Sequence, residues 1–259
     1  MPVVLVHGNP ETDAVWGPLV AELGRRGVLH GDDVVRLSPP GWGAPVPDGW
    51  GATLEEYRRW LVGELESIGE PVDLVGHDWG GGHAVNVAMT RPDLLRSWCT
   101  DVLGVFEPEY VWHDLAQGWQ TPGTGEAVVA AMLADPDALV QGLAPHGVPP
   151  DVAATMARGF DEGTGRCILG LYRDAAQPAM ARLGENLPAA AARPGLMVLA
   201  TDDPFGGAEE SRRRAATRAG AQVAVLEGLG HWWMLQDPAR GAAALTAFWA
   251  ARPSHPLPS

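Results

Sequence analysis

The sequence predicts an α/β protein built on one mostly parallel sheet of about six strands flanked by helices. Three observations support this prediction. Short apolar runs rich in β-branched residues recur along the chain, segments with helical periodicity lie between them, and the turns between them carry Gly, Pro or polar caps. A chain of 259 residues that is 46% hydrophobic can also bury one large core.

The apolar runs and the helical segments alternate in a βαβ series. Six runs have the length and composition of buried strands, at residues 3–6, 33–37, 72–75, 95–102, 196–200 and 222–226. Helical periodicity is found at residues 15–23, 54–68, 81–90, 209–219 and 238–251. Because each run is followed by a helical segment, we expect parallel strands joined by helical crossovers.

One long interruption divides this series. Residues 104–194 contain no strand pattern, and their short helical pieces are separated by Pro and Gly. A segment of this length is better interpreted as an inserted helical lid than as a loop. The expected organisation is therefore a first core part at 1–103, a lid at 104–194 and a second core part at 195–259, with a frayed Pro-rich tail from Pro253.

Charge and cysteine content exclude several classes of function. The formal net charge of -14 repels phosphate backbones and anionic lipid surfaces, so we expect neither nucleic acid nor membrane partners. The two cysteines, Cys99 and Cys167, are far apart and fit neither a disulfide framework nor a thiolate metal site. Without a basic leader or a long apolar span, the expected location is cytoplasmic.

The clearest chemical signal is a strand, a tight turn and a helix around Asp78. The apolar run at 72–75 leads into Gly-His-Asp-Trp-Gly-Gly-Gly at 76–82, which has the form of a G-x-S-x-G nucleophile elbow with Asp in place of Ser. Such a turn holds the central side chain in a strained, exposed position above a helix N-terminus. Asp78 could instead be a simple N-cap of the following helix.

Two further residues in the right chain order favour the nucleophile interpretation. His231 follows the last predicted strand in a Gly-flanked loop, which is the position of the base in the order nucleophile, acid, His. Asp203, followed by Pro204, comes after the preceding strand and is our candidate acid. Asp101, near the end of the strand at 95–102, is an alternative, although Asp is also common as a strand-end turn residue.

These motifs resemble the epoxide hydrolase and haloalkane dehalogenase branch of the α/β-hydrolase superfamily. The resemblance extends over most of the chain and rests on His-Gly-Asn-Pro-Glu at 7–11, Gly-His-Asp-Trp-Gly-Gly at 76–81 and Gly-His-Trp at 230–232. It implies an α/β-hydrolase fold in which Asp78 attacks an sp³ carbon to form an alkyl ester. A water activated by His231 then hydrolyses this ester, with no cofactor and no metal.

The resemblance also implies which groups bind the leaving group. The backbone N–H groups of Asn9 and Trp79 would form the oxyanion hole, and Tyr172 would donate a proton or hydrogen bond to an epoxide oxygen. A second lid tyrosine is expected where this chain has Leu115, with Tyr110 and His113 nearby. Trp112 and His113 are therefore expected as further lid contacts.

Other features of the same branch favour halide as the leaving group. In dehalogenases an Asn amide and the indole of the elbow Trp hold the halide, and Asn9 and Trp79 supply both groups here. Fluoroacetate dehalogenases carry an arginine near the elbow, which this chain lacks between residues 79 and 83.

Three hypotheses follow for a small apolar organic substrate. The leading one is an epoxide hydrolase that forms a vicinal diol, the alternative is a haloalkane dehalogenase, and the third is a non-catalytic binding protein with this fold. Family members usually place two antiparallel strands before the His-Gly strand. Their lack here predicts about six strands, and an exposed sheet edge that a homodimer partner could cover.

Overall fold

A computed structural model describes residues 2–29 and 33–251 and contains one six-stranded sheet. All of its neighbouring strands pair in parallel, in the order β2-β1-β3-β4-β5-β6. The strands are β1 (Val3–Val6), β2 (Val34–Leu37), β3 (Val72–Gly76), β4 (Leu95–Thr100), β5 (Gly195–Ala200) and β6 (Ala221–Leu226). The predicted fold class is confirmed, including the strand number.

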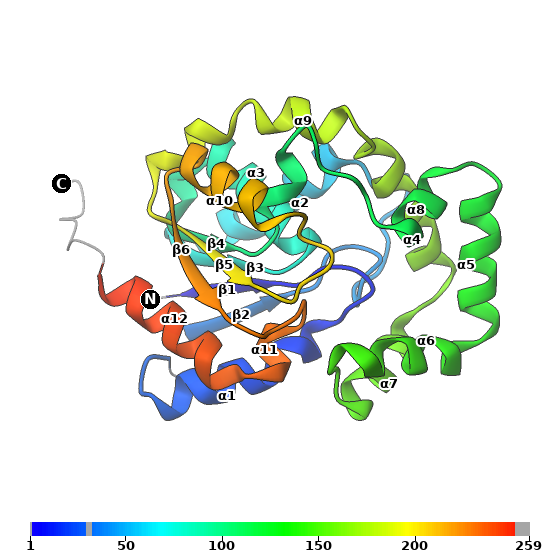
Figure 1. Cartoon of the computed structure of the whole chain (residues 1–259), viewed down its shortest axis with the longest axis horizontal. Helices are drawn as coiled ribbons and strands as arrows, with labels where there is room; N and C mark the ends of the chain where they lie inside the picture. Colours follow the sequence, from blue (N-terminus) through cyan, green and yellow to red (C-terminus); the bar gives the residue numbers. More distant parts are fainter. Residues whose placement is uncertain (1, 30–32, 252–259) are drawn as a thin grey trace.

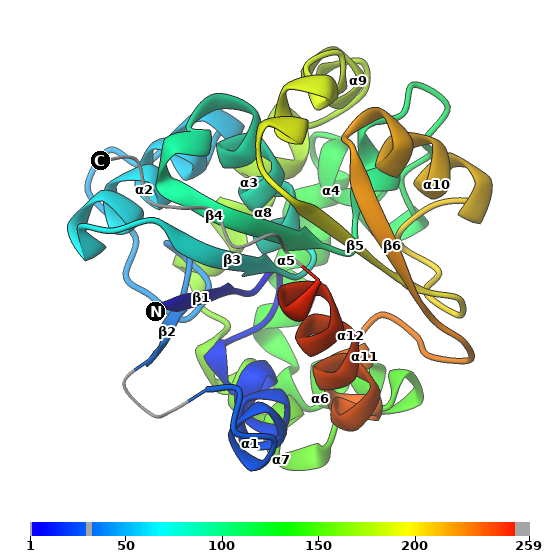
Figure 2. The ribbon, with the colours of Figure 1, turned by 90° about the vertical axis from the view of Figure 1, so that its left-hand side faces the viewer.

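Helices cover both faces of this sheet (Figure 2). One face carries α2 (Leu54–Ile68), α3 (Trp79–Thr90) and α10 (Glu209–Arg218). The other carries α1 (Gly17–Arg25), α11 (Trp233–Gln236) and α12 (Pro238–Ala250). Helix α2 shows how local sequence sets these boundaries, because a Thr53 and Glu56 capping box begins it and Gly69, at φ 80°, ends it.

Each face of the sheet has its own hydrophobic core because side chains alternate along every strand. In β1, Val4 and Val6 belong to the core beneath α2, α3 and α10. Val3 and Leu5 belong to the core beneath α1, α11 and α12. All four side chains are buried, so β1 lies in the centre of the protein with one core on each side.

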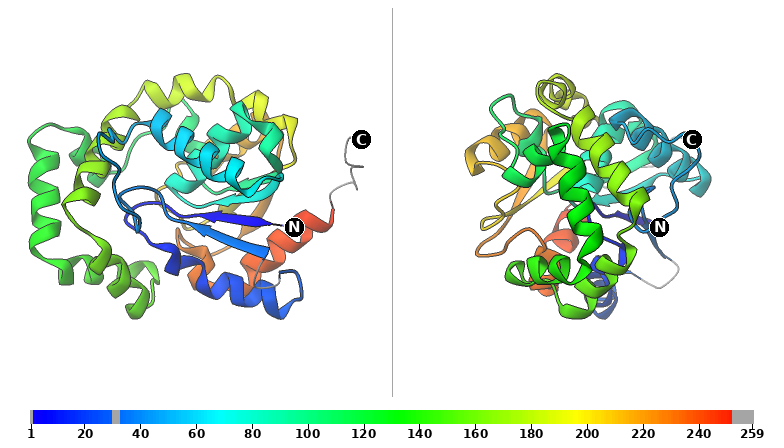
Figure 3. Two further views of the ribbon diagram at one scale, coloured as in Figure 1. Left: turned by 180° about the vertical axis from the view of Figure 1, so that it is seen from behind. Right: turned by 90° about the vertical axis from the view of Figure 1, so that its right-hand side faces the viewer.

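The chain between β4 and β5 is helical and contains no strand. It forms α4 (Asp114–Gln120), α5 (Thr124–Ala134), α6 (Pro136–Leu143), α7 (Pro150–Gly159), α8 (Glu162–Asp174) and α9 (Ala179–Gly184). Helices α4 to α8 lie at the end of the molecule opposite the start of β1, where the parallel strands finish (Figure 1). The same arrangement is visible from behind (Figure 3).

The last part of this segment returns to the sheet. Helix α9 packs against a 3-10 helix at Leu103–Phe106, and a second 3-10 helix at Leu187–Ala192 packs against α3. The indole N–H of Trp98 in β4 donates to the carbonyl of Ala190 at 3.0 Å. Only α4 to α8 therefore stand over the strand ends, whereas the final twenty residues of the segment are packed against the core.

Some predicted boundaries differ from the structure. The strand predicted at 95–102 ends at Thr100, because the Asp101 carboxylate is engaged by neighbouring loops. Helix α11 was not predicted, and α3 begins two residues earlier than expected, directly after Asp78. The tail from Pro253 lies outside the described residues. No single described helix has the length and hydropathy to cross a membrane, although α5 and the helical residues after it pass together as a sharply bent pair.

Candidate active site

Asp78 stands in a strained turn between β3 and α3. Its φ of 51° and ψ of -127° lie in a region that few residues other than glycine adopt. The close approach of helix to strand requires glycine at positions 76 and 80, where an added Cβ would lie 2.3 Å from the carbonyl oxygen of Gly80 and 2.1 Å from that of Val6, respectively. Although Asp78 occupies the N-cap position of α3, its carboxylate makes no capping hydrogen bond.

The Asp78 carboxylate is instead held over the loop that follows β1. The backbone N–H of Asn9 donates to Asp78 Oδ1 at 3.0 Å. A Cβ at Gly8 would lie only 2.1 Å from the same oxygen, so glycine is needed there for the two segments to meet. The predicted donor Asn9 thus faces the carboxylate, while the N–H of Trp79 belongs to the first turn of α3, where backbone donors have no helical partner.

His231 and Asp203 lie on the other side of the Asp78 carboxylate. His231 Nδ1 is 3.1 Å from Asp203 Oδ2, and His231 Nε2 is 3.7 Å from Asp78 Oδ2. Asp203 also accepts a hydrogen bond from the N–H of Phe205 at 2.8 Å, which fixes its side chain. The structure therefore brings the predicted nucleophile, base and acid together in that order.

Burial and charge set the protonation of these groups. Burial raises the pKa of Asp78 above its ordinary value, and the neighbouring His231 only partly opposes this shift. Burial also raises the pKa of Asp203, but His231 outweighs this effect and lowers the pKa to about 2. For His231 burial lowers the pKa, yet the Asp203 and Asp78 carboxylates leave the net pKa above 6.5.

The structure places Asp101, the alternative acid, elsewhere. Its Oδ1 accepts the N–H of Asp78 at 3.0 Å, and its Oδ2 accepts the indole N–H of Trp233 at 2.8 Å. Its other partner is His77, whose Nδ1 lies 2.5 Å from Oδ2. Asp101 thus contacts the elbow, and Asp203 is the carboxylate that contacts His231.

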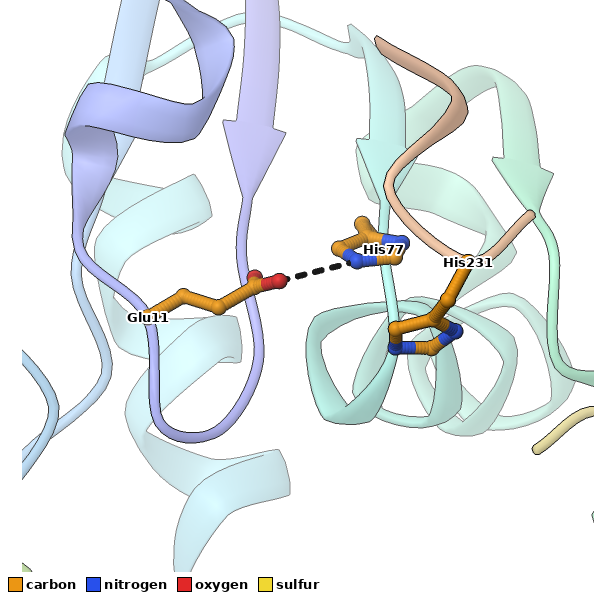
Figure 4. Close-up of side chains that lie close together, drawn as sticks. All are labelled: Glu11, His77 and His231. Atoms are coloured by element: carbon orange, nitrogen blue, oxygen red, sulfur yellow. Dashed lines mark ion pairs between the residues drawn. The ribbon is translucent and has the colours of Figure 1, made fainter. Parts of the chain in front are cut away.

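His77 links Asp101 to Glu11 in a cluster of buried charges beneath the site. His77 Nε2 is 2.9 Å from Glu11 Oε1, an ion pair whose angle is too poor for a hydrogen bond (Figure 4). Glu11 accepts the N–H of Gly8 at 2.9 Å and the indole N–H of Trp232 at 2.5 Å. Burial alone would raise the pKa of Glu11, but His77 lowers it to about 2.

This cluster also bears on metal binding. Among the described residues, Glu11, His77 and His231 are the one group whose donor atoms come close enough together to hold a metal ion. The pKa of His77 is raised well above 6.5, because the Asp101 and Glu11 carboxylates outweigh the effect of burial. The positive charge between the carboxylates is then the imidazolium itself, so we interpret the trio as an ion-pair cluster and not as a metal centre.

A cavity of about 450 Å³ opens in front of Asp78, between the strand ends and helices α4, α5, α6 and α8. Its reacting end is formed by Asn9, Asp78, Tyr172 and His231. The rest of its wall is predominantly apolar and includes Leu115, Trp119, Val128, Ala131, Met132, Ala138, Leu139, Leu143, Phe205 and Trp232. A cavity of this size and polarity suits a small organic molecule.

Tyr172, Asn9 and Trp79 meet at the reacting end of this cavity. Tyr172 is buried, and its ring contacts that of Trp79 edge-on at 5.3 Å. Burial and the Asp78 charge raise the pKa of Tyr172. The nearby polar groups of the Trp79 and Asn9 side chains lower this pKa, but by less. The Asn9 amide makes no well-aligned hydrogen bond among the described residues.

The other predicted lid contacts have different surroundings. Trp112 stacks on Trp79 at 5.7 Å, behind the main cavity. His113 and Leu115 line the cavity itself, with Leu115 44% exposed. Tyr110 donates its hydroxyl to the carbonyl of Phe205 at 2.7 Å, so this hydrogen is already engaged.

His113 has the protonation state of a neutral hydrogen-bond donor. Its Nδ1 accepts the N–H of Ala116 at 3.3 Å as the N-cap of α4. Burial lowers its pKa, so the neutral ring carries its hydrogen on Nε2. The sequence predicted no specific role for His77, Phe205 or Trp232, although His77 precedes Asp78 in the Gly-His-Asp-Trp motif and Trp232 follows His231 in the Gly-His-Trp motif.

The fold and site together define a hydrolase of the α/β class, and comparison with known proteins agrees. The sequence model of the Alpha/beta hydrolase family matches residues 3–244, so the chain belongs to this family. A characterised relative is the (E)-2-((N-methylformamido)methylene)succinate hydrolase of Acinetobacter baylyi. It is 29% identical over 96 residues, which is 37% of this chain and 35% of that enzyme.

Solved structures with the same fold include several hydrolases. The haloalkane dehalogenase DbeA from Bradyrhizobium elkani superposes with a TM-score of 0.71 at 21% identity, over 97% of this chain and 91% of that one. The enol-lactonase from Burkholderia xenovorans gives a TM-score of 0.69 at 20% identity, over 96% and 91%. At this level of identity the likeness establishes the fold.

Proposed function

We propose that this hydrolase acts through a covalent ester on Asp78 and that its substrate is an apolar epoxide, which it converts to a vicinal diol. The observation that supports this most is the surroundings of the Asp78 carboxylate. It faces an apolar cavity that also contains the Tyr172 side chain, and His231 and Asp203 lie behind it. The sequence offers no G-x-S-x-G motif for a serine mechanism.

In the first step, a carboxylate oxygen of Asp78 attacks a ring carbon of the epoxide. The carbon–oxygen bond of the ring breaks, and its electron pair goes to the epoxide oxygen. Tyr172, whose pKa is raised by burial, is protonated near neutral pH and donates its proton to that oxygen, which leaves a phenolate. The Nε2–H of His113 is a second donor lining the same cavity, and it takes the role expected of a second lid tyrosine.

In the second step, His231 removes a proton from water and the resulting hydroxide attacks the ester carbonyl carbon of Asp78. The developing oxyanion accepts the backbone N–H of Asn9, which already lies 3.0 Å from Asp78 Oδ1. The tetrahedral intermediate then collapses and releases the diol, with the proton of His231 passing to the leaving alkoxide. The proton left on the Asp78 carboxyl group returns to the Tyr172 phenolate, which restores both side chains. Asp203 stabilises the transient imidazolium.

We further propose that helices α4 to α8, within the predicted lid segment at 104–194, form the lid of this site, between core parts at 1–103 and 195–259. Helices α4 to α6 and α8 supply cavity residues to this lid, among them Trp119, Met132, Leu139 and Tyr172, and His113 lines the cavity just before α4. Closure over an apolar substrate would exclude bulk water during ring opening. A cytoplasmic location, a homodimer partner at the sheet edge, and a lack of nucleic acid and membrane partners stay predictions.

A haloalkane dehalogenase is the second candidate, and one observation favours it. The Asn9 amide lies at the reacting end of the cavity without an aligned hydrogen bond, and Trp79 is adjacent to Asp78. Donors of this kind can hold a departing halide. The first step would then expel halide in place of an alkoxide, and the second step would yield an alcohol.

The test is to trap the ester and to identify the products. A His231→Gln variant incubated with a panel of aryl and alkyl epoxides should gain the mass of one epoxide on the peptide containing Asp78. The matched Asp78→Asn, His231→Gln double variant should gain none. Diol formation by the native chain supports the proposal. Halide release from haloalkanes with epoxides unchanged would establish the alternative, and no adduct from either panel would contradict both.

A further inference from the structure

The buried cluster beneath Asp78 holds one histidine between two carboxylates. His77 Nδ1 lies 2.5 Å from Asp101 Oδ2, and His77 Nε2 lies 2.9 Å from Glu11 Oε1. The side chains of His77 and Glu11 have no exposure to solvent and that of Asp101 has 2%. Solvent therefore does little to stabilise the charges in this cluster, and each group depends on its partners in the protein.

The geometry decides the charge of His77. A neutral imidazole carries hydrogen on one nitrogen and a lone pair on the other. In one tautomer the Nδ1 lone pair would face Asp101 Oδ2 at 2.5 Å, and in the other an unprotonated Nε2 would lie 2.9 Å from Glu11 Oε1. Both arrangements are repulsive. The imidazolium has hydrogen on both nitrogens and is attracted to both carboxylates, in agreement with its strongly raised pKa.

The His77 ring also lies against the proposed base. The ring centroids of His77 and His231 are 4.5 Å apart, with an angle of 50° between their planes. Titratable groups reach this pair of rings from every surrounding loop. They are His7 and Glu11 after β1, Asp78 at the elbow, Asp101 after β4, His113 at the start of α4 and Asp203 after β5.

Most of these neighbours draw a proton onto His231. The Asp203 and Asp78 carboxylates both favour the imidazolium, which cannot accept a proton from water. His77 is the charged neighbour that acts in the opposite direction, because a second cation 4.5 Å away disfavours a first. The His77 ring thus places one positive charge in contact with the ring of the general base, although the cluster also contains two carboxylates.

We propose that His77 is a positioning residue whose fixed positive charge, held by Glu11 and Asp101, opposes protonation of His231 and so favours the neutral form that activates water. This role rests on the proposed function of His231. It also explains why the cluster contains two carboxylates: one alone leaves the second nitrogen of His77 without a counter-charge in a fully buried place.

The test is a pH titration of His77 and His231, monitored by NMR on ring-labelled protein in the absence of substrate. In the native chain, His77 should keep the signal of an imidazolium from about pH 5 to 9, whereas His231 should titrate within this range. In a His77→Gln variant the pKa of His231 should rise by about one unit, and the acid limb of ester hydrolysis should move by the same amount. A His231 pKa that is unchanged or lower would overturn the proposal.

Two further variants keep this test decisive. Glu11→Gln retains an acceptor for only one of its two donors, Gly8 and Trp232, and removes one carboxylate, so the His77 midpoint should fall even if His77→Gln does not fold. His83→Gln removes another fully buried histidine, whose pKa burial lowers to about 3, and should leave His231 unchanged. Because NMR titration needs no turnover, a failed epoxide assay leaves this result interpretable, and a neutral His77 overturns the proposal whatever the substrate.

Discussion

The two sides of the Asp78 carboxylate differ sharply in chemistry. In front of it lies a cavity of about 450 Å³ with mostly apolar walls. Behind it lie His231, Asp203 and the cluster of Glu11, His77 and Asp101, in which every charge is buried and has a partner. The front is suited to accept an apolar molecule, and the back holds charges in fixed positions.

This difference teaches how one carboxylate can serve two steps. Ring opening needs a nucleophile in a dry, apolar space, where it is poorly solvated. Ester hydrolysis needs a base and hydrogen-bond donors that are already oriented, because dipoles and charges that need not reorganise stabilise the transition state most. Changes behind Asp78 should therefore affect the chemistry of turnover, whereas changes in front should affect which substrate is used and how tightly.

The largest effect is expected at the boundary itself. An Asp78→Ala variant loses the proposed nucleophile, and we expect diol formation to fall by at least about 10⁴-fold, because the residual site supplies only binding and the oxyanion donors. Circular dichroism should show an unchanged fold, since the Asp78 side chain makes no capping hydrogen bond. Turnover within tenfold of the native rate would contradict the role of Asp78 as the nucleophile.

The next largest effect is expected behind Asp78. Asp203→Asn removes the charge that stabilises the His231 imidazolium, and we expect turnover to fall by about 10³-fold with ester accumulating. Asp202→Asn is the matched control, because Asp202 is exposed and does not contact His231. Equal losses in both variants would remove the distinction between the two carboxylates.

Asp203→Asn is also expected to change how the stability of the protein depends on pH. The pKa of Asp203 is lowered to about 2, so its charge contributes stability above the ordinary carboxyl pKa near 4 and this contribution disappears as the pH falls toward 2. Thermal unfolding between pH 6 and 2.5 should show a smaller acid loss in Asp203→Asn than in the native chain. Parallel curves would mean that Asp203 does not take part in this linkage.

A smaller effect is expected at the front, where the leaving group lies. Tyr172→Phe should slow epoxide opening about 10- to 100-fold while halide release changes little, because only the alkoxide needs the hydroxyl donor. Tyr110→Phe is the control, since its hydroxyl already donates to Phe205. Burst kinetics separate ring opening from ester hydrolysis. A loss of rate confined to hydrolysis would contradict the role of Tyr172 in ring opening.

The smallest effect is expected far from Asp78 on the cavity wall. Met132→Ala in α5 enlarges the apolar cavity, and we expect KM to change severalfold with kcat nearly constant, because uniform binding contacts alter KM alone. Val225→Ala on β6 removes an exposed apolar side chain and should change neither constant. A large change in kcat for Met132→Ala would show that the front also governs the chemistry.

The sheet and the three residues nearest the reaction could be predicted because each leaves a local pattern. The buried strands are short apolar runs. The elbow needs glycine at positions 76 and 80 because a Cβ would clash there, so the motif is visible in the sequence. Chain order was enough to bring Asp78, Asp203 and His231 forward as candidates. The structure places all three in contact, and their roles stay predictions until tested.

The buried cluster could not be predicted from sequence. Glu11, His77 and Asp101 come from three separate segments, and their meeting depends on strand order β1-β3-β4 and on the loop after β6 that supplies Trp232 and Trp233. The strand predicted at 95–102 also ends earlier, at Thr100. The next residue, Asp101, hydrogen-bonds a distant segment, which the local sequence does not reveal. For the same reason the engaged hydroxyl of Tyr110 could not be distinguished from a free one.

The residues of the cavity wall also bear on how the substrate preference of this enzyme could evolve. Val128, Ala131, Met132, Ala138 and Leu139 line the cavity from α5 and α6, and none belongs to the fully buried residues of either core. Substitutions there can reshape substrate preference at little cost to folding. Random mutagenesis restricted to these two helices is accordingly an economical route to new specificities on an unchanged catalytic frame.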